Sequence, residues 1–126
     1  MSEIVQEIQK EVGSWQGVSI SPHRFGGIEF QMNGREFGHL HGDYQADIPF
    51  TARLRQALVT EGKASPHHLY PKSGWVSFYL HGHADVASLI ELLRLNYNRL
   101  AKNRLNSVAS ENSQAIKEKF SAEREE

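Results

Sequence analysis

Histidine is the residue type that most clearly points to chemistry in this chain. Seven of the 126 residues are histidines, and there is no cysteine. Imidazole changes charge near neutral pH, so it can exchange protons or bind metal ions there, whereas the absence of cysteine excludes disulfides and thiolate-bound zinc. Six of the histidines form three close pairs: His39 and His41, His67 and His68, and His81 and His83. The last pair falls between a strand end and a helix start, where we expect solvated turn residues.

The first pair follows a clear hairpin signal. Asn33-Gly34 stands between two alternating apolar and polar runs, which predicts a two-residue turn and fixes the register of the strands. In a regular ladder Phe30 pairs with Phe37, and His39 and His41 then face the core.

A bulge at Gly38 would turn both imidazoles to the other face of the sheet. In the regular ladder they are buried and neutral, and we expect burial to lower their pKa.

Two imidazoles on one face of a strand could also share a metal ion. Zinc and iron sites combine histidines with a carboxylate, and Asp43 and Asp47 are close in sequence to His39 and His41. Hydrogen-bonded structural histidines give the same pattern. Metal binding is therefore an alternative, and the main interpretation needs no metal or cofactor.

The second pair lies in a loop restricted by proline, from Pro66 to Trp75. Adjacent residues of an extended segment point to opposite sides, so one histidine of the pair can face a given pocket. We assign this role to His68, with Tyr70 and Ser73 nearby as further parts of a pocket wall.

Periodicity predicts the elements that position these side chains. We expect helices over 2–13, 51–61 and 86–100, and strands over 18–21, 28–32, 35–41, 44–50 and 75–80. This order indicates one α+β domain over residues 1–103, with a mostly antiparallel sheet of four to five strands flanked by about three helices. Residues 104–126 are predicted to be a polar tail, either a short helix or disordered.

Composition restricts the class of protein. The net charge is -1, which argues against a general nucleic-acid binder. No apolar run reaches the about 20 residues of a membrane span, and the N-terminus does not resemble a signal peptide. We therefore expect a cytoplasmic protein that does not contact membranes.

Five ordered motifs stand out along the chain, namely Phe25–Phe30, Gly34–Asp43, Asp47–Phe50, His67–Phe78 and Leu92–Tyr97. Together they resemble the small bacterial luciferase-domain family. Fungal luciferases share the name of this domain, and they add dioxygen to a hydroxylated pyrone without metal or flavin. The resemblance implies common ancestry and suggests related chemistry. The strand at Trp75 and the helix at 92–97 also resemble YjbR-type proteins, which implies a nucleic-acid or protein interaction module.

These observations together predict a pocket between the Phe37–His41 strand and the Pro66–Trp75 loop. In such a pocket a neutral histidine takes a proton from a small aromatic or enolic ligand, and the electron-rich product can react with dioxygen without a cofactor. A binding domain without turnover would use the same pocket.

The predicted catalytic residues are His39, His41 and His68. The predicted ligand-binding residues are Phe37, Asp43, Asp47, Tyr70, Ser73 and Trp75. The alternatives are a metal-dependent enzyme or sensor using His39 and His41, and the YjbR-like module.

Overall fold

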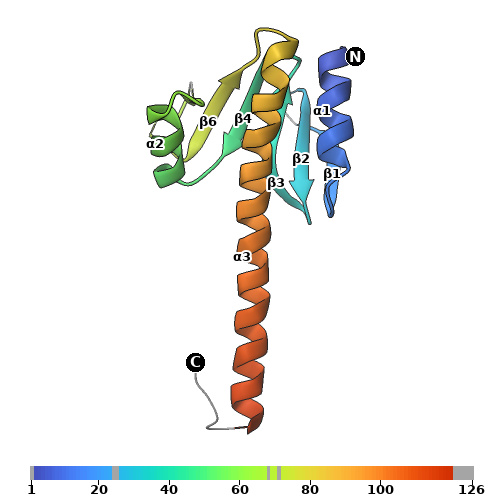
Figure 1. Ribbon diagram of the computed structural model, residues 1–126. Coiled ribbons are helices and arrows are strands. Elements are labelled where there is room, and N and C mark those ends of the chain that lie inside the picture. The colour runs from blue at the N-terminus through green and yellow to red at the C-terminus, as the bar shows by residue number, and fades with distance from the viewer. Residues whose placement is uncertain (1, 24–25, 68, 71, 121–126) are drawn as a thin grey trace.

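The computed structural model describes residues 2–23, 26–67, 69–70 and 72–120, with side chains as far as residue 105. It is an α+β domain, as predicted, with a six-stranded sheet (Figure 1). The elements are α1 (Glu3–Gly13), β1 (Val18–Pro22), β2 (Ile28–Met32), β3 (Arg35–His41), β4 (Gln45–Pro49), α2 (Ala52–Thr60), β5 (Ser65–Pro66), β6 (Trp75–Tyr79), a 3₁₀ turn (His83–Asp85) and α3 (Val86–Phe120). The strand beyond the predicted five is β5, which has two residues.

The first two helices begin at the predicted capping residues. The hydroxyl of Ser2 accepts a hydrogen bond from the backbone N–H of Val5 at 3.2 Å, and the hydroxyl of Thr51 accepts one from Leu54 at 3.1 Å. These bonds satisfy backbone donors that the first turn of a helix leaves unpaired.

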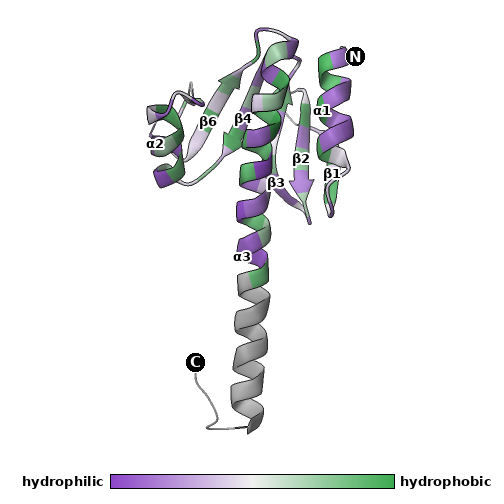
Figure 2. Cartoon of the chain, in the orientation of Figure 1, coloured by the Kyte–Doolittle hydropathy of each residue, from purple (hydrophilic) through white to green (hydrophobic). Residues whose placement is uncertain are grey.

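The sheet is antiparallel throughout, in the order β1-β2-β3-β4-β6-β5. Helices α1 and α3 pack against each other, α1 contacts β1, and α3 contacts β2, β3 and β4 (Figure 1). Apolar side chains of α3, among them Leu89 and Leu93, are completely buried there, and Figure 2 shows hydrophobic residues recurring along the part of α3 beside the sheet.

Beyond the sheet α3 continues to Phe120, so the two sides of the predicted boundary at 103/104 belong to one helix.

The hairpin between β2 and β3 contains a β-bulge. The predicted turn pairs Met32 with Arg35, but further along Phe30 pairs with Gly38, which leaves Phe37 as an extra residue in β3. The regular-ladder prediction that the imidazoles of β3 face the core is therefore wrong. The bulged alternative holds, and it reverses the direction of every side chain beyond Phe37 relative to a regular ladder.

Helix α3 holds this bulge in place. A Cβ added to Gly38 would lie 2.6 Å from Cδ2 of Leu93, so Gly38 faces α3 and its missing side chain lets the helix approach. The side-chain amide of Asn96 donates hydrogen bonds to the carbonyl oxygens of Phe37 and Pro49, both at 3.1 Å. Because side chains alternate along a strand, the residues that follow Gly38 at odd numbers point away from α3. We call that side of the sheet the histidine face.

No helix in the described part of the chain combines the length and apolar composition needed to cross a membrane.

Removing the Asn96 amide should destabilise the whole domain. Asn96→Ala leaves the carbonyl oxygen of Phe37 without this donor at a completely buried position, whereas the carbonyl of Pro49 keeps a hydrogen bond from Arg99 at 3.0 Å. We expect the free energy of unfolding to fall by roughly 1–3 kcal/mol in urea titrations. Asn103→Ala, at an exposed position of the same helix, is the control and should change stability by less than about 0.5 kcal/mol. Equal losses in both variants would show that α3 does not act through this amide.

Candidate functional site

A continuous polar row crosses the histidine face of the sheet. The cross-strand pairs place Glu29, His39, Asp47, Ser77 and Ser65 side by side on five neighbouring strands. Asp47 lies in the middle of this row on β4 and is 1% exposed. A buried carboxylate needs hydrogen-bond donors around it, because it has lost its contacts with water.

Five side chains surround the Asp47 carboxylate. Its Oδ2 atom faces three imidazole Nε2 atoms, and its Oδ1 atom accepts hydrogen bonds from a hydroxyl and an amide. The partners of Oδ2 are His41 at 2.9 Å, His39 at 3.4 Å and His67 at 3.4 Å; those of Oδ1 are Ser77 at 2.8 Å and Gln45 at 3.0 Å. We call Asp47, Glu36 and the three histidines the Asp47 cluster.

Asp47 is ionised despite its burial. Burial by itself raises the pKa of this carboxyl, but the hydrogen bonds from His39, Gln45, Ser77 and His41 outweigh it and hold the pKa well below its usual range. The carboxylate is therefore a fixed negative charge beneath the histidine face.

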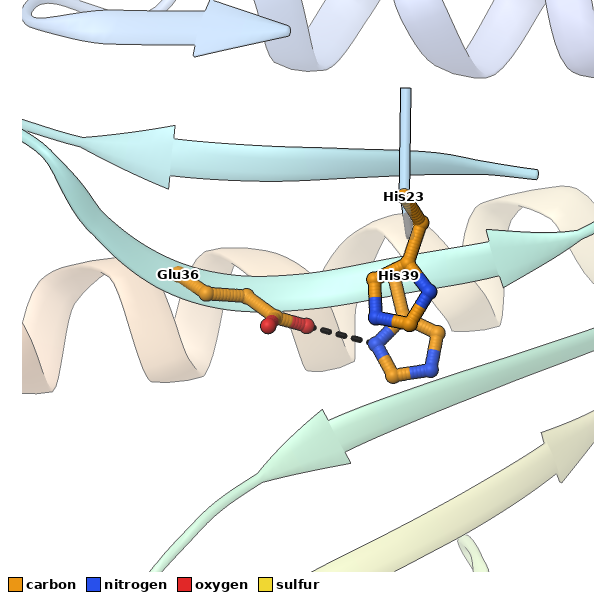
Figure 3. A group of neighbouring side chains, drawn as sticks. All are labelled: His23, Glu36 and His39. Carbon is orange, nitrogen blue, oxygen red and sulfur yellow. Dashed lines mark hydrogen bonds and ion pairs between the residues drawn. The ribbon is translucent and has the colours of Figure 1, made fainter. Parts of the chain in front are cut away.

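His39 lies between two carboxylates. Its Nδ1 atom is 2.5 Å from Oε2 of Glu36 (Figure 3). Its Nε2 atom faces Asp47. Burial alone would lower the pKa of His39, but the contacts with Asp47 and Glu36 raise it to about 9. The expectation that burial keeps this imidazole neutral is thus wrong, because both ring nitrogens meet anions. His39 is a cation at neutral pH.

His23 covers the ring of His39. It follows β1, and the two ring centroids are 4.0 Å apart with planes inclined by 20° (Figure 3). Burial lowers the pKa of His23, and the neighbouring positive charge of His39 lowers it further. A neutral ring stacked on a cationic one avoids repulsion between like charges.

His41 differs from the other imidazoles around Asp47 in having an available nitrogen. Its Nε2 atom is held by Asp47 at 2.9 Å, its side chain is 25% exposed, and within the described chain no hydrogen-bond partner reaches its Nδ1 atom. A neutral ring that donates from Nε2 has its lone pair on Nδ1. A carboxylate that orients an imidazole in this way is the arrangement of a general base.

Two aromatic side chains flank the Asp47 cluster. The Trp75 ring lies 5.6 Å from that of His39 and 5.9 Å from that of His67. Tyr70 stacks on His67 at 5.3 Å with its plane inclined by 24°, and Tyr70 is 60% exposed. These rings offer an apolar surface beside the polar row.

The structure thus brings together His39, His41, Asp47, Tyr70 and Trp75 of the predicted site residues.

The other predicted site residues lie elsewhere. Phe37 is completely buried on the α3 side, where its ring packs against Trp15 and Tyr97. Asp43 is exposed in the turn after β3. Ser73 organises the loop before β6, since its hydroxyl donates to the carbonyl of Tyr70 at 2.8 Å. His68 lies outside the described residues.

Sequence reasoning missed several members of the site. They are His23, Glu36, Gln45 and Ser77. Of the pair His67 and His68, the pocket role was assigned to His68, whereas it is His67 that the structure places against Asp47. Ser77 and Gln45 carried a usable signal, because each is two residues from an assigned residue on the same strand face. Glu36 gave none, since its placement depends on the bulge. The choice between His67 and His68 depends on the loop conformation, which the sequence pattern does not give.

Among the described residues, two sets of side chains are compact enough to hold a metal ion. They are His39, His41 and Asp47, and His23, Glu36 and His39; in each set the ligand atoms lie within 4.8 Å of one another. Both sets contain His39, whose two nitrogens carry protons directed to carboxylates. A metal ion therefore fits only if it replaces a proton of His39.

The charge of His39 predicts how stability depends on pH. Because folding raises its pKa from 6.5 to about 9, its contribution is fully present below pH 6.5 and is lost as the pH rises through about 9. In urea titrations from about pH 6 to about pH 10, the wild type should lose on the order of 3 kcal/mol through this group. His39→Gln should flatten the profile, whereas His83→Gln, which removes an exposed histidine 2.6 Å from Glu7, should leave it unchanged. A wild-type profile that is flat to pH 9 would contradict the double ion pair.

Comparison with known proteins bears on the family to which the chain belongs. No curated protein and no solved structure matches the chain. The family model of the Luciferase domain matches residues 34–96, which is half of the chain and includes all of β3, β4 and β6. The chain therefore belongs to the luciferase-domain family.

Proposed function

We propose that the histidine face binds a small planar organic molecule with an acidic hydroxyl group, and that His41 takes the proton of that group. The observation that supports this most strongly is the contact of 2.9 Å between Nε2 of His41 and Oδ2 of Asp47. It orients the imidazole so that Nδ1, on a partly exposed ring, is the proton acceptor.

The charges of the site favour this proton transfer. With His41 neutral, the two carboxylates of Glu36 and Asp47 face the one cationic ring of His39. A proton on His41 balances this excess negative charge, and the imidazolium then pairs with a carboxylate that already contacts it. The carboxylate therefore stabilises the state that follows the transfer more than the state before it.

The neighbouring aromatic rings support a planar ligand. The exposed Tyr70 and the partly buried Trp75 both contact the ring of His67, and aromatic faces stack well on flat conjugated molecules. Family membership suggests the type of reaction, because the name of this domain is shared with luciferases.

We propose an addition of dioxygen as the reaction. Loss of the hydroxyl proton to His41 makes the ring an enolate, and an electron pair of an enolate carbon forms the new carbon–oxygen bond. Dioxygen is thereby reduced to a carbon-bound peroxide, which recovers the proton from His41. The overall change is insertion of O₂ into a carbon–hydrogen bond of the keto form, so atoms and electrons balance without a cofactor.

The test compares two probes that differ in one group. We would titrate 4-hydroxy-6-methyl-2-pyrone and its 4-methoxy analogue into the protein by calorimetry. The wild type should bind the hydroxy compound roughly tenfold or more tightly, because only this compound can share a proton with Nδ1, as the acidic hydroxyl or as its anion paired with the protonated imidazole. His41→Gln keeps a donor for Asp47 but has no base nitrogen, and it should remove the preference.

His81→Gln is the matched control, since His81 is exposed and outside the Asp47 cluster; it should bind both probes as the wild type does. Equal binding of the two probes by the wild type, or equal effects of both substitutions, would contradict the proposal. Elemental analysis of the same samples tests the alternative. Near-stoichiometric zinc or iron that His39→Gln and His41→Gln remove would favour the metal-dependent interpretation.

A further inference from the structure

His67 is held in one tautomer by the backbone of its own loop. Its Nδ1 atom accepts hydrogen bonds from the backbone N–H groups of Leu69 at 3.1 Å and Tyr70 at 3.2 Å. A backbone amide can only donate, so Nδ1 carries no proton and the proton of the neutral ring is on Nε2. That Nε2 atom is 3.4 Å from Oδ2 of Asp47.

The ring of His67 thus connects two parts of the molecule. One nitrogen closes the turn at Leu69 and Tyr70, and the other faces the carboxylate at the centre of the sheet. The side chain is only 7% exposed, with Tyr70 stacked on its ring and Trp75 in a T-shaped contact with it.

The far end of the loop is also fixed. The backbone N–H of Phe50 donates to the carbonyl of Gly74 at 3.0 Å, and a Cβ added to Gly74 would lie 2.1 Å from the Phe50 carbonyl oxygen. The loop therefore enters β6 against the end of β4. At the other end the link to Asp47 depends on the His67 ring.

We infer that His67 is a positioning residue, which docks the loop at Leu69 and Tyr70 onto Asp47 and so sets the ring of Tyr70 at the edge of the Asp47 cluster. It does not act as the base, because its acceptor nitrogen is already occupied. The tautomer and the docking stand on the contacts of His67 alone, whereas the effect on ligand binding rests on the function proposed above.

Two conservative substitutions separate the two contacts of the ring. In His67→Asn the side-chain oxygen takes the place of Nδ1 and can still accept from the turn, but nothing reaches Asp47. In His67→Gln the terminal amide takes the place of Nε2 and can still donate to Asp47, but the acceptor for the turn is lost. His81→Asn and His81→Gln are the matched controls at an exposed position.

The first measurement uses NMR of the protein without ligand. The ¹⁵N signals of the His67 ring should show an unprotonated Nδ1 and a protonated Nε2 in the wild type. Amide exchange at Leu69 and Tyr70 should be roughly tenfold or more faster in His67→Gln and unchanged in His67→Asn. A protonated Nδ1, or the same exchange rates in both variants, would overturn the inference.

The second measurement uses 4-hydroxy-6-methyl-2-pyrone as the probe. Both variants at His67 should bind it roughly tenfold more weakly than the wild type, and both variants at His81 should bind it equally well. Unchanged affinity in both His67 variants would overturn the positioning role. If the wild type itself does not bind the probe, the proposed function fails, and the NMR results still decide whether His67 docks the loop.

Discussion

A carboxylate buried at the centre of the sheet is the constraint on which the histidine face depends. An ionised group without solvent is costly unless donors surround it, and Asp47 meets this requirement with five side chains from four different segments. Two of these side chains come from β3, one from β6, one from β4 itself and one from the loop after β5. Satisfying one carboxylate therefore fixes the relative positions of three strands and a loop.

The two faces of the sheet are linked through the bulge in β3. The Asn96 amide on α3 holds the carbonyl of Phe37, and Phe37 is the residue that shifts the register. With Phe37 and Gly38 both on the helix side, Glu36 and His39 point together to the other side, where their side chains are 2.5 Å apart. Packing of the core thus determines which groups meet at the candidate site.

Local sequence patterns were sufficient for the elements and for part of the site. The Asn-Gly turn, the caps at Ser2 and Thr51, and the joint placement of His39, His41 and Asp47 follow from contacts within a few residues. The direction of the imidazoles did not, because it depends on a hydrogen bond between residues 59 positions apart in the chain. The sign of the pKa shift of His39 was also predicted wrongly. The sequence around a buried histidine does not show whether carboxylates lie at both ring nitrogens, and these carboxylates are what raise the pKa.

The three imidazoles around Asp47 show why residue type alone does not assign a role. All three present Nε2 to the same oxygen, so the partner of the second nitrogen distinguishes them. At His39 that partner is a carboxylate, which makes the ring a cation. At His67 it is a pair of backbone amides, which makes the ring a neutral donor. Only at His41 does the second nitrogen remain available among the contacts of the described chain. A site that moves protons needs one basic nitrogen and fixed charges around it, and this division of the imidazoles supplies both.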